Sequence, residues 1–173
     1  MNRAERIRVF VDPGSEVTLL NPNLLTRLAM TSTTVRGMII TGPGSGPRLC
    51  TEQVAFRLAA LDGSIWCRAQ AWVYPQIGAI SVPVTPKELI DKARANGVKL
   101  SEENTSRVVP DLVIGVDYAD RDEFTAKEIR RITPSVIASR LPFGWALRGF
   151  YQQELNTVSA QVASYSAVPA PCG

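Results

Sequence analysis

A single carboxylate at the end of an apolar run is the side chain best placed to do chemistry. Asp12 follows residues 6–11, which alternate and then become apolar, and it opens the turn Asp12-Pro13-Gly14-Ser15. The run predicts a strand that enters a core, and the proline and glycine end it abruptly. Ordinary surface turns have the same sequence, so a functional role for Asp12 depends on the rest of the chain.

The absence of histidine narrows the available reactions. Ser-His-Asp and Cys-His catalysis are excluded, as are the usual zinc sites that contain histidine. The three cysteines are scattered and odd in number, so they predict neither a disulfide framework nor a zinc site within one chain. Asp117, Asp120 and Asp122 lack the glycine and the terminal glutamate of a calcium loop. A hydrolase of this composition must use carboxylates, lysine or a metal bound by oxygen ligands.

Length and composition predict one globular domain with many turns. A chain of 173 residues can bury one core, and its 45% hydrophobic and 20% charged residues are typical of globular proteins. Twelve glycines and twelve prolines are spread along the chain. They favour short elements, and therefore an all-β or α+β class.

The charge pattern predicts no nucleic-acid or membrane partner. The net charge of +3 comes from interspersed basic and acidic residues, which is typical of a solvated surface. No apolar run approaches the roughly 18 residues of a membrane helix. The charged first residues lack the apolar core of a signal peptide. We therefore expect a cytoplasmic or particle-associated protein that is not secreted.

Three segments carry helix signals. Asn21-Pro22 has the residue types of a helix N-cap and first helical position. Thr85 and Glu88 have the spacing of a capping box, and Gly97 is a suitable C-terminal stop. The segment at 122–132 is predicted to be a short amphipathic helix. The predicted helices cover residues 22–30, 85–96 and 122–132.

Most of the remaining chain has strand character. Asp62-Gly63 is a hairpin signal between two of the predicted strands, and this hairpin would bring Phe56, Trp66 and Trp72 together as core aromatics. Residues 98–110 are expected to be an exposed connection. The predicted strands cover residues 6–11, 17–20, 35–40, 49–59, 64–74, 111–115, 134–140 and 144–149.

Features further along the chain support a functional role for the Asp12 turn. A Gly/Pro-rich stretch follows at 41–47, and a later apolar run ends at Gly115. This order resembles the retroviral-type aspartic peptidases, and in particular the peptidase segment of Pao/BEL-type retrotransposon polyproteins. Within residues 7–150, the stretches that carry the resemblance are 9–20, 111–118 and 143–149.

The resemblance implies an all-β, retropepsin-like acid-protease barrel with short helices and one half-site per chain. The peptidase domain would cover residues 1–150. Residues 151–173, which are small and polar, are expected to be a flexible tail or linker. Phe143 and Trp145 are expected to be core or dimer-interface aromatics rather than substrate contacts.

The resemblance also assigns roles to individual residues. Asp12 would be the catalytic acid and base, and Gly14 would allow the tight turn and the approach of a substrate backbone. Glu16 would face the substrate, although a plain surface charge is an equally good explanation. Gly115 would let its strand pass close behind the turn. The implied site residues are Asp12, Pro13, Gly14, Ser15, Glu16, Ile39, Ile40, Thr41, Gly42, Gly44, Ile114 and Gly115.

Residues 39–46 would form a flap, a hairpin tip that closes over bound peptide and excludes water. A surface loop is an equally good explanation of this segment. The implied mechanism uses no cofactor and no metal. The implied partners are a peptide or polyprotein substrate and a second copy of the chain.

A second copy of the chain is implied because one chain does not supply both carboxylates that the mechanism needs. Two carboxyls about 3 Å apart share one proton, and the pair activates water. Asp62-Gly63 lacks the intervening residue of the Asp12 turn, and neither Asp111 nor Asp117 precedes such a turn. The second carboxylate would therefore be Asp12 of a homodimeric partner.

One position departs from the family pattern. Between Asp12 and Gly14 the family usually has Ser or Thr, whose hydroxyl and N–H link the two catalytic loops, whereas Pro13 has neither group. Losing such buried hydrogen bonds would weaken the dimer by about 1 kcal/mol each. A catalytically weak or inactive module that dimerises or binds peptide is therefore the main alternative. An unrelated β-rich binding domain is a third.

Overall fold

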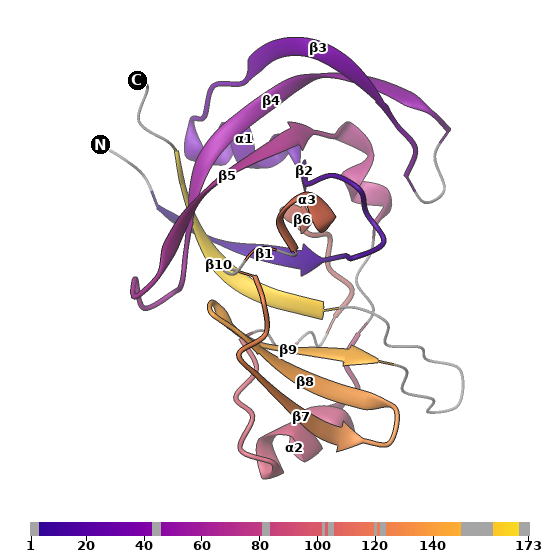
Figure 1. Ribbon diagram of the computed structural model, residues 1–173, viewed down its shortest axis with the longest axis vertical. Coiled ribbons are helices and arrows are strands. Elements are labelled where there is room, and N and C mark those ends of the chain that lie inside the picture. Colours follow the sequence, from indigo (N-terminus) through magenta and orange to yellow (C-terminus); the bar gives the residue numbers. More distant parts are fainter. Residues whose placement is uncertain are drawn as a thin grey trace.

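The computed structural model of the chain consists mainly of β-strands (Figure 1). It describes residues 4–42, 46–80, 84–101, 103, 106–119, 121, 124–149 and 161–169, and only the backbone of residues 79, 119 and 161–169. The predicted all-β class is confirmed. Within these described ranges, no helix combines the length and the apolar character that a membrane crossing requires.

The described elements follow the predicted order closely in the first half of the chain. The helices are α1 (Pro22–Leu28), α2 (Lys87–Ala95) and α3 (Val116–Ala119), with a 3-10 helix at Pro75–Ala79. The strands are β1 (Glu5–Val11), β2 (Leu19–Leu20), β3 (Thr33–Ile40), β4 (Arg48–Ala59), β5 (Trp66–Val73), β6 (Leu112–Ile114), β7 (Glu128–Thr133), β8 (Val136–Leu141), β9 (Gly144–Gly149) and β10 (Gln161–Pro169).

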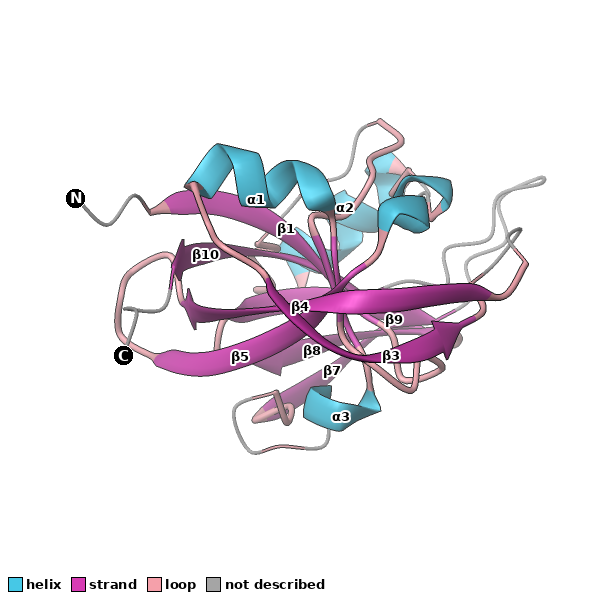
Figure 2. Ribbon diagram, turned by 90° about the horizontal axis from the view of Figure 1, so that it is seen from above, coloured by secondary structure: helices cyan, strands magenta, loops and turns pink. Residues whose placement is uncertain are grey.

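Seven strands pair in the order β10-β1-β6-β2-β5-β4-β3, and β10 also pairs with β4. A continuous run of pairings therefore leads from β10 through β1, β6, β2, β5 and β4 back to β10. Strands β7, β8 and β9 form a separate antiparallel sheet. Figure 1 shows this sheet and α2 below the larger one, and Figure 2 shows the pair from above.

Strand β1 lies between two groups of buried side chains because its residues alternate. Ile7, Val9 and Val11 are buried in the largest core cluster, whereas Phe10 packs against a second cluster. The parallel partner β6 contributes Leu112 to the first cluster. Removing such side chains from water on both faces of a strand is the main stabilising contribution to this part of the fold.

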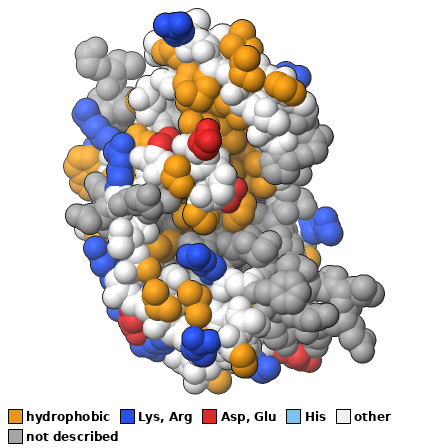
Figure 3. All heavy atoms as spheres, turned by 45° about the vertical axis from the view of Figure 1, so that its right-hand side comes forward, with side chains coloured by type: hydrophobic (Ala, Val, Ile, Leu, Met, Phe, Trp, Pro, Cys, Tyr) orange, Lys and Arg blue, Asp and Glu red, His pale blue; other side chains and the backbone are white. Residues whose placement is uncertain are grey.

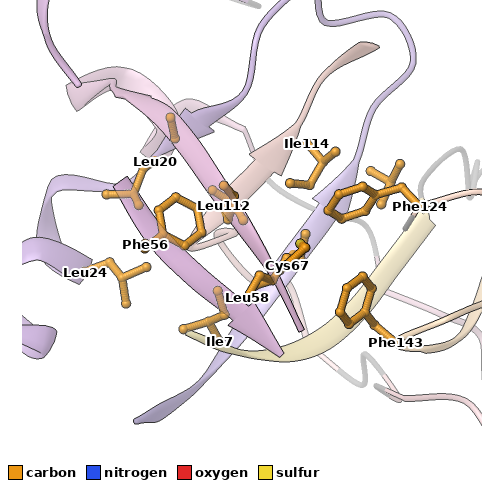
Figure 4. Close-up of a cluster of buried hydrophobic side chains, with 14 of the residues drawn as sticks. Ile7, Leu20, Leu24, Phe56, Leu58, Cys67, Leu112, Ile114, Phe124 and Phe143 are labelled. Atoms are coloured by element: carbon orange, nitrogen blue, oxygen red, sulfur yellow. The ribbon is translucent and has the colours of Figure 1, made fainter. Parts of the chain in front are cut away.

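The large cluster also joins the two sheets. Phe56 of β4 lies in this cluster with Phe124, which precedes β7, and with Phe143, which lies between β8 and β9 (Figure 4). Phe124 and Phe143 are in ring contact, with centroids 5.5 Å apart. The sheets therefore share one core, and Phe143 is a core residue as expected.

The prediction of a tail over 151–173 is wrong for residues 161–169. These residues form β10, which pairs antiparallel with β1 and with β4. The small, polar composition of the segment concealed the strand, because β pairing is made by backbone N–H and C=O groups that every residue except proline supplies in full.

The prediction of a helix over 122–132 is also wrong, because residues 128–133 form β7. Ile132 packs against the cluster that contains Leu89 and Ala93 of α2, whereas Ile129 is 62% exposed. Arg130 donates to the carbonyl of Asn96 after α2 and lies over the ring of Trp145 on β9. These contacts require the period of two that a strand provides.

Three finer predictions need correction. Helix α2 is present, but its N-cap is Pro86 and no side chain caps it, so Thr85 does not form the predicted capping box. The hairpin at Asp62-Gly63 is present, yet only two of its three aromatics are buried: Phe56 and Trp72 are core residues, whereas Trp66 is 53% exposed. Val98 is buried, so the connection after α2 is not wholly exposed.

Candidate active site

Main-chain hydrogen bonds fix the Asp12 turn directly after β1. The N–H of Asp12 donates to the carbonyl of Ile114 on β6 (2.9 Å), and the N–H of Ser15 donates to the carbonyl of Asp12 (3.1 Å). The N–H of Gly14 donates to the carboxylate oxygen Oδ1 of Asp12 at 2.9 Å. The carboxylate is half-buried and held within its own turn.

Gly14 and Gly115 each allow other atoms to come close to their Cα, but the atoms differ. A Cβ at position 14 would lie 3.2 Å from Asp12 Oδ1, the atom that the Gly14 N–H binds. A Cβ at position 115 would lie 2.6 Å from the carbonyl carbon and oxygen of Val17. Gly115 therefore lets the end of β6 pass directly behind the turn, as predicted.

A buried threonine and an aspartate connect this turn to α3. Thr18 is fully buried, and its N–H and hydroxyl both donate to the carboxylate of Asp117, at 3.0 and 2.7 Å. The N–H of Gly115 donates in turn to the Thr18 hydroxyl oxygen at 3.1 Å. A carboxylate that accepts both donors of one residue fixes the backbone on either side of it.

Sequence reasoning missed this role of Asp117, which it considered as a ligand for a cation and as a second catalytic carboxylate, and rejected as both. The signal was available in the two motifs themselves: a threonine three residues after Ser15 and an aspartate two residues after Gly115. No group of potential metal ligands occurs among the residues that the structure describes.

The turn lines a cleft of about 530 Å³. Eight of the predicted site residues line this cleft: Asp12, Gly14, Ser15, Glu16, Ile39, Ile40, Thr41 and Gly42. Ile114 and Gly115 lie behind the turn, where they support it. The lining residues that sequence reasoning missed are Val17, Leu19, Met38, Ile80 and Val113.

The far wall of the cleft comes from the end of β3 and the residues after it. Ile39 is 70% exposed although it is a large apolar residue, and it pairs across the hairpin with Leu49, which is 63% exposed. Ile40 is buried. Of the predicted flap, residues 39–42 line the cleft and residue 46 does not, whereas residues 43–45 lie outside the described residues.

Asp12 and Glu16 lie among small, hydroxylic and apolar residues of the described cleft lining. Figure 3 shows one face of the molecule, on which acidic side chains lie among apolar ones. Pro13 points elsewhere: it is exposed and lines a separate cavity of about 300 Å³ with residues that include Phe124, Ile129 and Arg148. The turn thus separates the cleft from a second, mostly apolar hollow.

An ion-pair network holds the elements that carry the turn. Arg27 of α1 pairs with Glu5 at the start of β1 and with Asp111 just before β6. Asp111 Oδ2 also accepts from the N–H of Arg8 at 2.9 Å. The hydrogen bond to Glu5, and next the bond to Asp111, raise the pKa of the Arg27 guanidinium, although partial burial opposes them.

No protein-family model, no curated protein and no solved structure matches this chain.

Proposed function

We propose that this chain is an aspartic endopeptidase of the retrotransposon type, which hydrolyses peptide bonds in a polyprotein as a homodimer. The observation that carries the proposal is the position of Asp12, in a turn fixed by backbone hydrogen bonds and on the wall of a cleft whose opposite wall is an apolar hairpin end. The Gly115 strand behind the turn supports it further.

The proposed chemistry needs a second Asp12 from the partner chain. The two carboxyls share one proton. The ionised carboxylate takes a proton from water as the water oxygen adds to the scissile carbonyl carbon, and the protonated carboxyl donates its proton to the carbonyl oxygen. As the C–N bond breaks, the carboxyl that took the proton from water gives it to the leaving nitrogen. The other carboxylate takes a hydroxyl proton from the tetrahedral carbon, which becomes the product carboxyl group, so the pair again shares one proton. No histidine, metal or cofactor takes part.

Pro13 favours a second candidate function. The residue lacks both an N–H and a hydroxyl, so it offers the partner's turn only its carbonyl oxygen. Under this alternative the chain is a dimerisation or peptide-binding module with weak or no catalytic activity.

Cleavage of a peptide library distinguishes the two functions. We expect the purified chain to cut peptides at mildly acidic pH, with products identified by mass spectrometry, and Asp12→Asn to abolish cutting while the circular dichroism spectrum stays unchanged. Cutting that survives in Asp12→Asn would eliminate Asp12 as the catalyst. An inert wild type in which Pro13→Ser restores cutting would favour the alternative.

A further inference from the structure

The charge of the cleft is of one sign. Among the residues that the structure describes, Asp12 and Glu16 are the only charged ones that line it, and the rest of this lining is small, hydroxylic or apolar. A peptide that enters this cleft therefore meets negative charge that no lysine or arginine of the lining compensates. Charge of one sign within low-dielectric walls favours ligands of the opposite sign.

Glu16 is held firmly by its neighbours, although its own side chain is exposed. The carbonyl of Ser15 accepts from the N–H of Val116 at 2.9 Å, and the Ser15 hydroxyl donates to the carbonyl of Val17 at 2.8 Å. Within the described part of the chain, the Glu16 carboxylate has no ion pair and no hydrogen bond. Its position is therefore fixed while its charge remains available to a ligand.

We propose that Glu16 selects a peptide that carries a lysine or arginine next to its apolar residues. This inference rests on the proposed function, since it names the substrate of the same cleft. Lysine and arginine suit the cleft for two reasons: their charge complements Glu16, and their aliphatic stems suit apolar lining such as Val17 and Ile80. An acidic residue at the same peptide position would be repelled.

The test measures binding separately from cleavage. Fluorescently labelled peptides with a non-cleavable hydroxyethylene isostere between two apolar residues are titrated with the wild-type chain, and Lys, Gln or Glu is substituted at each flanking position in turn. At one position, the Lys peptide should bind about fivefold more tightly than the Gln peptide, the size of a partly exposed ion pair. The Glu peptide should bind more weakly than both.

Three controls assign that preference to Glu16. Glu16→Gln should remove it, and Glu16→Lys should invert it in favour of the Glu peptide. Asp91→Asn, which changes a carboxylate on α2 outside the cleft, should leave it intact. Raising the salt concentration to 1 M should reduce the preference, because ions screen a partly exposed pair.

The outcomes separate this inference from the proposed function. Binding that shows the Glu16-dependent preference, with no cleavage of the matching natural peptides, would support the inference and overturn the peptidase proposal. Cleavage of Lys, Gln and Glu peptides at equal rates, with equal affinities, would overturn the inference alone. No binding of any peptide in the series would overturn both.

Discussion

Asp117 and Thr18 form the hydrogen-bonded pair that connects the segment after the Asp12 turn to α3. Asp117 accepts both donors of Thr18, and Thr18 is fully buried. The turn residues Asp12 and Ser15 are bonded to β6 and to Val116 through their own backbones. The pair therefore supports the turn that holds the Asp12 carboxylate, although neither Thr18 nor Asp117 lines the cleft.

We predict that Asp117→Ala lowers the free energy of unfolding by about 1–3 kcal/mol, because it leaves two donors of Thr18 without an acceptor. Urea denaturation measures the change. Asp91→Ala, at an exposed carboxylate on α2, is the control and should change stability by less than about 0.5 kcal/mol. Equal stabilities of the Asp117 and Asp91 variants would contradict this role.

The double variant Thr18→Val with Asp117→Ala tests whether the two residues act as a pair. Replacing both side chains removes the Thr18 hydroxyl together with its acceptor, so the combined loss of unfolding free energy should be smaller than the sum of the two single losses. Strict additivity in the same denaturation experiment would mean that the two side chains do not depend on each other.

At the scale of the elements, β6 is the strand that supports the site. Its last residue, Ile114, accepts the hydrogen bond from Asp12, and Gly115 lies against the backbone of Val17. This close approach can be tested without changing any charge.

We predict that Gly115→Ala lowers the free energy of unfolding by about 1–3 kcal/mol, because the new Cβ would lie 2.6 Å from backbone atoms that cannot move aside. Gly78→Ala is the matched control, since a Cβ there meets nothing within 4 Å. Urea denaturation of the two variants checks the comparison. If the Gly115→Ala chain is as stable as the control, the backbone of Val17 does not lie so close to position 115.

Strand β10 should be required for cooperative unfolding of the chain. A chain that ends at residue 160 lacks this strand, so the edges of β1 and β4 that pair with it lose their partners. We expect that chain to lose cooperative thermal unfolding followed by circular dichroism, whereas a chain ending at residue 169 keeps it. Cooperative unfolding of the shorter chain near the wild-type temperature would contradict the place of β10 in the fold.

Elements with strong local signals could be predicted from the sequence. Asp62-Gly63 specifies the hairpin of β4 and β5, and Asn21-Pro22 specifies the start of α1. Strand β10 could not, because it pairs with β1 and β4, which lie far away in the sequence. Strand β7 was missed for another reason: its residues were interpreted as an amphipathic helix, although it pairs with β8 directly after it. In the cleft, Asp12 could be predicted because its own turn marks it. Leu19, Ile80 and Val113 were missed because they reach the cleft only through the folding of distant segments.

At the scale of the whole molecule, the proposed activity requires two copies. Asp12 is the only aspartate among the described residues that line the cleft. We predict that peptidase activity per chain rises with protein concentration and levels off as the dimer forms, in parallel with the sedimentation coefficient. Activity per chain that is constant across the monomer–dimer transition would contradict a site shared between chains.

The most direct test of the account is a crystal structure of the chain with a hydroxyethylene peptide bound. We predict a two-fold symmetric dimer in which the two Asp12 carboxyls lie about 3 Å apart and both contact the isostere hydroxyl. A peptide bound elsewhere, or Asp12 side chains that are remote from each other in every assembly, would contradict it.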